Sequence, residues 1–420
     1  MYLTINILGI FVFLGVAVLF SKDRKNINWT SVGIMVAINI VLSWFLVNSK
    51  VGIDGVKGAA DGFKWLVDIS YKGIEFALPD WVHVKQMNFV TSALLPILMI
   101  VPLFDILTYI GVLPFIIKWV GKGLSYITRQ PKFESFYAVE MMFLGNTEAL
   151  AVSGLQLRQM KSKRLVTIAM MSMSCVTASI LGAYLLMMPG QYIIAAVPVN
   201  IINAIIVTAV LNPVKVTPEE DVIAKIGSSS ENTDTIEDGS EELAEHQADK
   251  KKKKEPFFSF LGDSILGAGR LILIITANVI AFVALAALID ALLSKINPAF
   301  TLENILGVIM FPFAWLLGFD PSHAFQMAQY MGTKLVTNEF VVMGKVTPIL
   351  NTFTPHFKAT LTVFLTSFAN FSTTGMIIGA FKTLVNKEKN DVISENVGYM
   401  LLSGVLVSLL SAAFVGIFVW

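Results

Sequence analysis

Two short polar motifs place carboxylates inside otherwise apolar parts of the chain. One is Asn146-Thr147-Glu148 and the other is Thr337-Asn338-Glu339, so each joins an amide, a hydroxyl and a carboxylate. A carboxylate at membrane depth costs about 2.5–3.5 kcal/mol even on a lenient insertion scale, so Glu148 and Glu339 each need a partner or a purpose. Their acceptors suit a neutral ligand with vicinal hydroxyls and a flat, hydrogen-bonding edge, such as a nucleoside.

A polar interruption of an apolar stretch follows each motif at the same distance. Ser179 lies 31 residues after Glu148, and Asn370 lies 31 residues after Glu339. The equal spacing predicts two structural repeats. Lys334 is the one candidate cation beside the second motif, and two acidic groups oppose it, so an anionic ligand would fit poorly.

The composition is that of a membrane protein. Hydrophobic residues make up 55% of the 420 residues, charged residues make up 15%, and the mean hydropathy is +0.70. Soluble domains usually carry about a quarter of charged residues, and a membrane helix needs about 20 mostly apolar residues. Eight stretches are predicted to span the membrane: 3–20, 29–47, 89–120, 165–188, 192–211, 265–293, 359–384 and 397–420.

Charge and sulfur content exclude several functions. The net charge is +1 and the basic residues form no dispersed surface, which argues against nucleic acid as a partner. Cys175 is the single cysteine and the four histidines are scattered, so the sequence predicts no disulfide framework, no metal cluster and no Cys/His catalytic pair. We expect no cofactor.

Lys and Arg in the short connections set the predicted orientation. Five basic connections alternate as cytoplasmic: 21–28, 118–132, 158–164, 213–257 and 382–389. Both termini then lie outside. The stretches 133–157 and 321–342 must each enter and leave the membrane on one side, which predicts two re-entrant helical hairpins. Because the first enters from inside and the second from outside, the two repeats are inverted.

The predicted fold is an all-α polytopic membrane protein with eight transmembrane helices, two re-entrant hairpins in inverted repeats and two broken helices. These features together describe a secondary transporter whose substrate binds near the membrane midplane. The predicted parts are the N-terminal spans, an external amphipathic segment and a scaffold helix in 1–120, the first repeat in 121–212, a disordered charged cytoplasmic loop in 213–257, a second scaffold helix in 258–302 and the second repeat in 303–420.

Three motifs in order resemble the signatures of the concentrative nucleoside transporter family in its eight-span bacterial form. They are Gly145-Asn146-Thr147-Glu148, Thr337-Asn338-Glu339-Phe340-Val341 and Ser367-Phe368-Ala369-Asn370-Phe371-Ser372. The resemblance extends over nearly the whole chain. It implies a homotrimer in the bacterial cytoplasmic membrane, in which a mobile region of each protomer carries a nucleoside past a scaffold as an elevator.

The resemblance also implies which residues contact the substrate. The nucleobase would face Asn146, Thr147 and Ile180. The ribose would be bound by Glu148, Glu339, Asn370 and Thr373, with Phe368 beside it.

The chain departs from the family pattern at two places. Many members have Gln where this chain has Asn146, so the preference between purine and pyrimidine bases stays open. Sodium-coupled members use an Asn and a Ser where this chain has Met141 and Cys175. Sulfur is a poor ligand for a hard cation, which leaves only carbonyl oxygens such as those of Leu144 or Val176. We therefore predict proton coupling.

Three carboxylates are candidates for carrying the coupling proton: Glu148, Glu339 and Glu140. Burial of such a group favours its neutral form, which allows it to take up a proton on one side of the membrane and release it on the other. A sodium-coupled nucleoside symporter is the alternative.

Two other classes of function use some of the same residues. An intramembrane enzyme could use the pair Glu148 and Glu339 as acid and base, but the chain shows no nucleophile–base arrangement, metal set or nucleotide loop, and an enzyme gives no reason for inverted halves. A channel is disfavoured by carboxylates at the hairpin tips. We therefore expect a transporter and not an enzyme.

Overall fold

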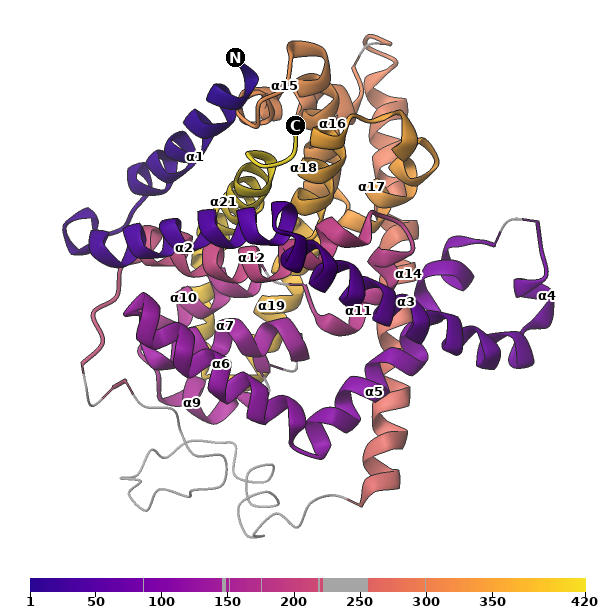
Figure 1. Ribbon diagram of the computed structural model, residues 1–420, viewed down its shortest axis with the longest axis horizontal. Helices are drawn as coiled ribbons and strands as arrows, with labels where there is room; N and C mark the ends of the chain where they lie inside the picture. Colours follow the sequence, from indigo (N-terminus) through magenta and orange to yellow (C-terminus); the bar gives the residue numbers. More distant parts are fainter. Residues whose placement is uncertain are drawn as a thin grey trace.

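The computed structural model describes residues 1–85, 87–145, 149–150, 152–174, 176–217, 220–221, 256–298 and 300–420. Throughout these residues the regular secondary structure is helical, as the apolar composition predicts (Figure 1). Most of the predicted charged loop 213–257 lies outside them. The motif residues Asn146, Thr147 and Glu148 and the single cysteine, Cys175, also lie outside the described residues.

Six helices in the described residues are long and apolar enough to cross a membrane. They are α1 (Tyr2–Leu19), α2 (Trp29–Asn48), the helix Val90–Tyr109, α12 (Gly190–Leu211), α14 (Phe257–Leu293) and α21 (Val397–Gly416). The helix Val90–Tyr109 consists of the π-helical turn η2 (Val90–Leu94) and α5 (Ile97–Tyr109). The sequence predicts eight spans, and the two others, 165–188 and 359–384, are each divided into shorter helices.

The two divided spans are interrupted at their polar positions. The first consists of α10 (Ser162–Ser172) and α11 (Ala178–Leu185), and the second of α18 (Pro355–Leu365) and α19 (Phe371–Leu384). Both second halves begin with a side-chain cap. Thr177 accepts a hydrogen bond from the amide of Ile180 at 3.3 Å, and Asn370 accepts one from the amide of Thr373 at 2.8 Å. The polar side chains thus replace backbone partners lost where each helix is broken.

The predicted span 89–120 is also shorter than expected. Gly111, with φ 91°, turns the chain after α5 in a left-handed conformation that other residues rarely adopt, and α6 (Val112–Thr128) follows as a separate helix.

The remaining helices connect these elements. In the first half of the chain they are η1 (Arg24–Asn26), α3 (Lys50–Ala77), α4 (Pro79–Val82), α7 (Lys132–Leu144) and α9 (Gly154–Gln159). In the second half they are α15 (Leu302–Trp315), α16 (Pro321–Val336), α17 (Glu339–Val346), η3 (Thr347–Thr352) and α20 (Lys387–Glu395).

The apolar helices differ strongly in how much of their surface the protein covers. In the most apolar window of α12, 83% of the residues are buried inside the protein, whereas the corresponding share for α14 is 6%. Figure 1 shows α12 in the middle with α21 above it, and α14 as a long helix that runs from one end of the molecule to the other. The helix α14 packs against α5. An apolar helix without protein cover is typical of a membrane surface. The described core therefore lies around α12 and α21.

Side-chain amides join the central helices. The Nδ2 of Asn39 on α2 donates to Oδ1 of Asn203 on α12 at 2.8 Å, and the Nδ2 of Asn203 donates to Oγ of Ser411 on α21 at 2.9 Å. Between helices in an apolar environment, such bonds and small residues at the contacts supply much of the specificity of packing.

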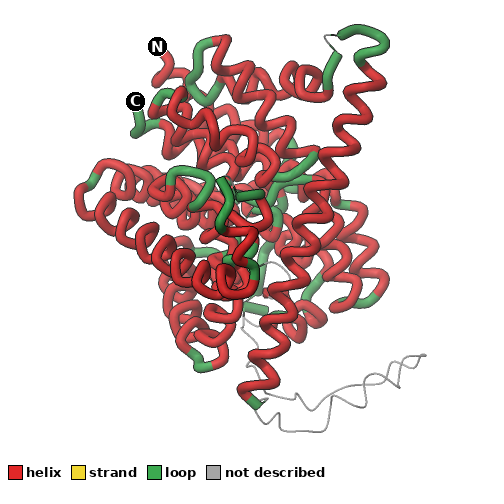
Figure 2. The backbone as a smooth tube through the Cα atoms, turned by 90° about the vertical axis from the view of Figure 1, so that its right-hand side faces the viewer, coloured by secondary structure: helices red, strands yellow, loops and turns green. Residues whose placement is uncertain are grey.

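Both termini lie at the same end of the molecule (Figures 1 and 2). The sequence predicts that this end faces outside. That orientation stays a prediction.

Candidate functional site

A cavity opens where α5 and α14 meet the starts of α11, α17 and α19. Six of the residues to which the sequence analysis assigns a role in binding the substrate or an ion line it: Leu144, Ile180, Glu339, Phe368, Asn370 and Thr373. The fold thus brings together, from four separate segments of the chain, residues that are up to 229 positions apart. Asn146, Thr147 and Glu148 belong to the same prediction and lie outside the described residues.

Glu339 is the carboxylate of this cavity. It is the first residue of α17, it is 3% exposed, and each of its oxygens has one protein partner. The hydroxyl of Tyr184 on α11 donates to Oε1 at 2.8 Å, and the Nδ2 of Asn370 donates to Oε2 at 3.2 Å. A carboxylate offers about four lone-pair positions, so the two donors leave about two acceptor positions for a ligand.

Three helices begin at the cavity, and a polar side chain caps each of them. The caps are Thr177 for α11, Asn338 for α17 and Asn370 for α19, and all three line the cavity. The partial positive charge at a helix N-terminus favours negative and oxygen-rich groups. This electrostatic field stabilises the carboxylate of Glu339 and supports hydrogen bonding to oxygen atoms of a ligand.

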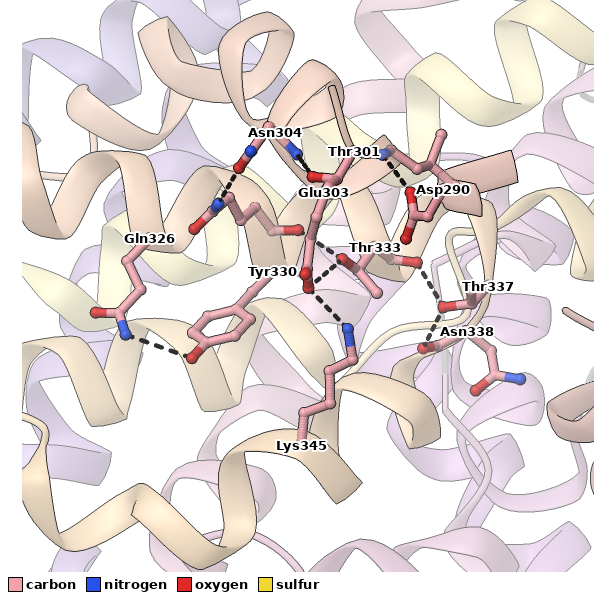
Figure 3. A network of polar contacts seen from close by, with 12 residues as sticks. Asp290, Thr301, Glu303, Asn304, Gln326, Tyr330, Thr333, Thr337, Asn338 and Lys345 are labelled. Carbon is pink, nitrogen blue, oxygen red and sulfur yellow. Dashed lines mark hydrogen bonds and ion pairs between the residues drawn. The ribbon is translucent and has the colours of Figure 1, made fainter. Parts of the chain in front are cut away.

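A polar network holds the second motif against the helices that precede it (Figure 3). Oε1 of Glu303 on α15 accepts hydrogen bonds from Nζ of Lys345 on α17 at 2.8 Å and from Oγ1 of Thr333 on α16 at 3.2 Å. Oγ1 of Thr337, in the turn between α16 and α17, donates to the carbonyl of Thr333 at 2.5 Å. The network therefore fixes the turn immediately before Asn338, the cap of α17.

The first motif begins at a comparable turn. Gly145 has φ 95° and ends α7, a conformation that suits glycine because it lacks a Cβ. After the motif the chain is described again at Ala149 and Leu150, and Leu150 lines the cavity. Leu144 and Leu150, the described residues on either side of the first motif, therefore line the same cavity as the second motif.

Glu140, the third candidate for a coupling proton, lies elsewhere. It is buried on α7, and its Oε2 accepts a hydrogen bond from Oγ of Ser153 at 2.8 Å. It is absent from the described lining of the cavity. The structure thus separates Glu140 from Glu339.

The described residues at the predicted sodium position are poor ligands for that ion. The thioether of Met141 is buried, and Val176 is buried in the break between α10 and α11. Sodium prefers oxygen, so at these two positions and at Leu144 only backbone carbonyls remain. The described break has two side-chain oxygens beside these positions. Oγ of Ser174 is buried and has no hydrogen-bond partner among the described residues, and Oγ1 of Thr177 caps α11.

Sequence reasoning did not find three polar contributors to the site. Tyr184 binds Glu339, Asp105 of α5 lines the cavity and accepts a hydrogen bond from Ser264 of α14, and Asn278 of α14 lines it as well. A carboxylate within the apolar span 89–120 is a signal that could have identified Asp105, because such residues usually serve a function. Tyr184 and Asn278 lie outside the motifs and the polar interruptions on which the sequence analysis depends.

Two family models match the chain. The model described as Na+ dependent nucleoside transporter N-terminus matches residues 8–81, and the one described as Na+ dependent nucleoside transporter C-terminus matches residues 192–416. The second match alone covers more than half of the chain and includes Glu339 and Asn370.

Two bacterial relatives align over almost their whole length. The purine nucleoside transport protein NupG of Bacillus subtilis (strain 168) is 41% identical over 420 residues, which are 100% of both chains. The nucleoside permease NupC of Helicobacter pylori is 24% identical, and the alignment covers 99% of this chain and 97% of that protein.

Solved structures share the fold. CNTnw in an inward-facing substrate-bound state is 25% identical, with a TM-score of 0.86 over 100% of this chain and 98% of that chain. A variant of CNTnw in its intermediate 1 state has a TM-score of 0.87 over 100% of both chains. The matches of sequence over the whole length and of fold agree with the motifs, and the chain belongs to the concentrative nucleoside transporter family.

Proposed function

We propose that the protein imports nucleosides across a bacterial cytoplasmic membrane as a secondary active symporter. The observation that carries this proposal is the pairing of Glu339 with Tyr184 and Asn370 at the wall of a largely apolar cavity. The two acceptor positions left on the carboxylate match the two vicinal hydroxyls of a ribose. Purine nucleosides are the first substrates to test, because the relative at 41% identity is named for their transport.

The rest of the cavity suits a nucleobase. Phe104, Phe143 and Phe368 provide aromatic surface, and Ile180 provides aliphatic surface. A flat base gains by covering such groups, and polar groups at its edge need partners of the kind that Asn146 and Thr147 would supply. The ribose would then be held by Glu339, Asn370 and Thr373 together with Glu148.

We further propose that the substrate crosses the membrane with the repeats while α5 and α14 stay fixed. The two hairpins would be re-entrant and inverted, and the substrate would move as in an elevator. The boundary between the two parts would cross the cavity, where Nδ2 of Asn278 on α14 donates to Oγ of Ser372 on α19 at 3.3 Å. The bare apolar surface of α14 supports a homotrimer in a bilayer, since such a surface must meet lipid or another protomer.

Proton coupling is proposed because this chain has Met141 and Cys175 at the two positions where sodium-coupled members have an Asn and a Ser, and sulfur is a poor ligand for a hard cation. Glu148, Glu339 and Glu140 remain the candidates for the carrier. Sodium coupling through backbone carbonyls is the competing proposal, and the names of the matching family models are consistent with it.

Uptake and counterflow in proteoliposomes test the function and the coupling ion separately. Purified protein is reconstituted, and the accumulation of radiolabelled adenosine, inosine and uridine is followed under imposed proton or sodium gradients. We expect concentrative uptake that persists when choline replaces sodium and stops when a protonophore dissipates the pH gradient. Sodium-dependent uptake that is insensitive to the protonophore would refute proton coupling, and the absence of any nucleoside counterflow would refute the transport function.

A further inference from the structure

Lys334 is the one lysine that is buried among the described residues, and its side chain is fully covered. Its Nζ donates to the carbonyl of Phe364 at 2.6 Å and to Oγ of Ser367 at 2.6 Å, and it lies 4.6 Å from the centroid of the Phe364 ring. Oγ of Ser367 also pairs with Oγ of Ser408 on α21 at 2.6 Å. Burial of an ammonium group is strongly unfavourable unless it has such partners. These three contacts are therefore what allows Lys334 to be buried.

The ammonium lies at the broken end of a helix. Phe364 is in the last turn of α18, where carbonyls lack partners within the helix and carry the negative end of the helix dipole. On the other side of the break, Asn370 caps α19 and binds Glu339. The helices α16 and α17 thus present a positive charge to the end of α18 and a negative charge to the cap of α19.

The first half of the chain has no lysine at the matching place. Lys334 stands five residues before Glu339, and Phe143 stands five residues before Glu148. Phe143 lines the cavity, whereas Lys334 is absent from its described lining. The cationic contact with a broken helix therefore belongs to the second half alone at this position.

We propose that Lys334 is a tethered cation that fills a monovalent-cation site in the second broken helix. Its ammonium takes a carbonyl oxygen, a hydroxyl oxygen and an aromatic face, which are groups that bind small cations. By holding α16 on the end of α18, it sets the distance between Glu339 and Asn370 and so keeps the nucleoside-binding carboxylate in place. Lys334 is therefore a positioning residue, and the inference rests on the proposed binding of nucleosides at Glu339.

The test removes the tethered cation and supplies a free one. Lys334→Ala deletes the atoms of one n-propylammonium ion, so the variant is purified and reconstituted with and without n-propylammonium, and nucleoside binding is measured by scintillation proximity. We expect the affinity to fall by about tenfold or more and to recover with the amine, because hydrogen bonds to a charged group are among the stronger ones. Lys382→Ala, which removes the same atoms from an exposed lysine on α19, is the matched control and should bind normally in both conditions.

Each result decides the proposal. Undiminished binding by Lys334→Ala would overturn it, and so would equal recovery with neutral n-propanol, because then only volume matters. If Lys334→Ala does not fold, Lys334→Arg and Lys334→Met are compared: binding by the first alone supports a cationic role, and equal binding by both rejects it. If none of these folds, Ser367→Ala keeps the ammonium and removes one of its oxygens, and unchanged affinity in that variant rejects the proposal. Loss of binding in the unmodified protein would instead refute the proposed function.

Discussion

Glu339→Gln tests the central contact of the candidate site. In the protein as it stands, Tyr184 and Asn370 each donate to one carboxylate oxygen. A glutamine has only one acceptor oxygen. If that oxygen turns to Asn370, the amide nitrogen faces the hydroxyl of Tyr184, which then loses its acceptor inside the protein. If it turns to Tyr184, two amide nitrogens face each other, and Asn370 can turn only by giving up its cap of α19.

The expected effect follows from these contacts. Hydrogen bonds to a charged group contribute about 1.5–3 kcal/mol, and the substitution removes the charge from the bond to a ribose hydroxyl. That loss corresponds to nucleoside binding weakened about 10-fold to 150-fold. In either orientation one hydrogen-bond donor lacks an acceptor, which adds a separate cost of about 1–3 kcal/mol to the free energy of folding.

Equilibrium binding of a radiolabelled nucleoside to the purified variant measures the first quantity, and thermal unfolding follows the second. Glu388→Gln makes the same chemical change on an exposed residue of α20 and should leave binding unchanged. Wild-type affinity in Glu339→Gln would refute the assignment of Glu339 as the ribose-binding carboxylate.

Three further predictions address packing, a buried ion pair and the coupling ion. Gly404→Ala on α21 places a Cβ 2.8 Å from the Cβ of Ala369, in the second break, and 3.1 Å from the Cβ of Met173, in the first. We expect this crowding to lower the free energy of unfolding by about 1–3 kcal/mol, measured by thermal unfolding. The control Gly398→Ala meets open space and should not destabilise the protein. Arg164 donates two hydrogen bonds of 2.8 Å to the buried carboxylate of Glu134 on α7. Arg164→Met leaves that carboxylate without its charged partner, so we expect the free energy of unfolding, measured with a chemical denaturant, to fall by about 3–5 kcal/mol. A loss no larger than that expected for an exposed ion pair would contradict this prediction. The double variant Met141→Asn, Cys175→Ser places side-chain oxygens at the predicted sodium position and should make nucleoside uptake faster in sodium than in choline. Identical uptake rates in the two ions would count against that position.

The sequence predicted the breaks and the residues beside them better than it predicted the spans. Thr177 and Asn370 are recognisable because a hydroxyl or an amide in an apolar helix is unfavourable unless it caps a helix end. The equal spacing to the two motifs then places both breaks in relation to Glu339, and the cavity confirms that Ile180, Asn370 and Thr373 lie with that carboxylate. Their roles in binding stay predictions.

Other features depend on contacts between distant segments and leave no local pattern. Tyr184 looks like any aromatic residue of an apolar helix, and only the packing of its ring against Phe340, with 5.0 Å between ring centroids, brings its hydroxyl to Glu339. The end of the span 89–120 was missed for a different reason. Hydropathy continues through Gly111, whereas the backbone changes direction there.

The length of α14 has a consequence for the depth at which the residues beside it lie in the membrane. A helix of 37 residues is about 55 Å long, but the uncharged run 271–289 between Arg270 and Asp290 measures about 28 Å, close to the thickness of the hydrocarbon layer of about 30 Å. We therefore expect the first turns of α14, which include Ser264, to project beyond the lipid tails. We therefore expect Asp105, which accepts a hydrogen bond from Ser264 and lines the cavity, to lie near the water boundary, where an anionic side chain in an apolar stretch keeps contact with solvent.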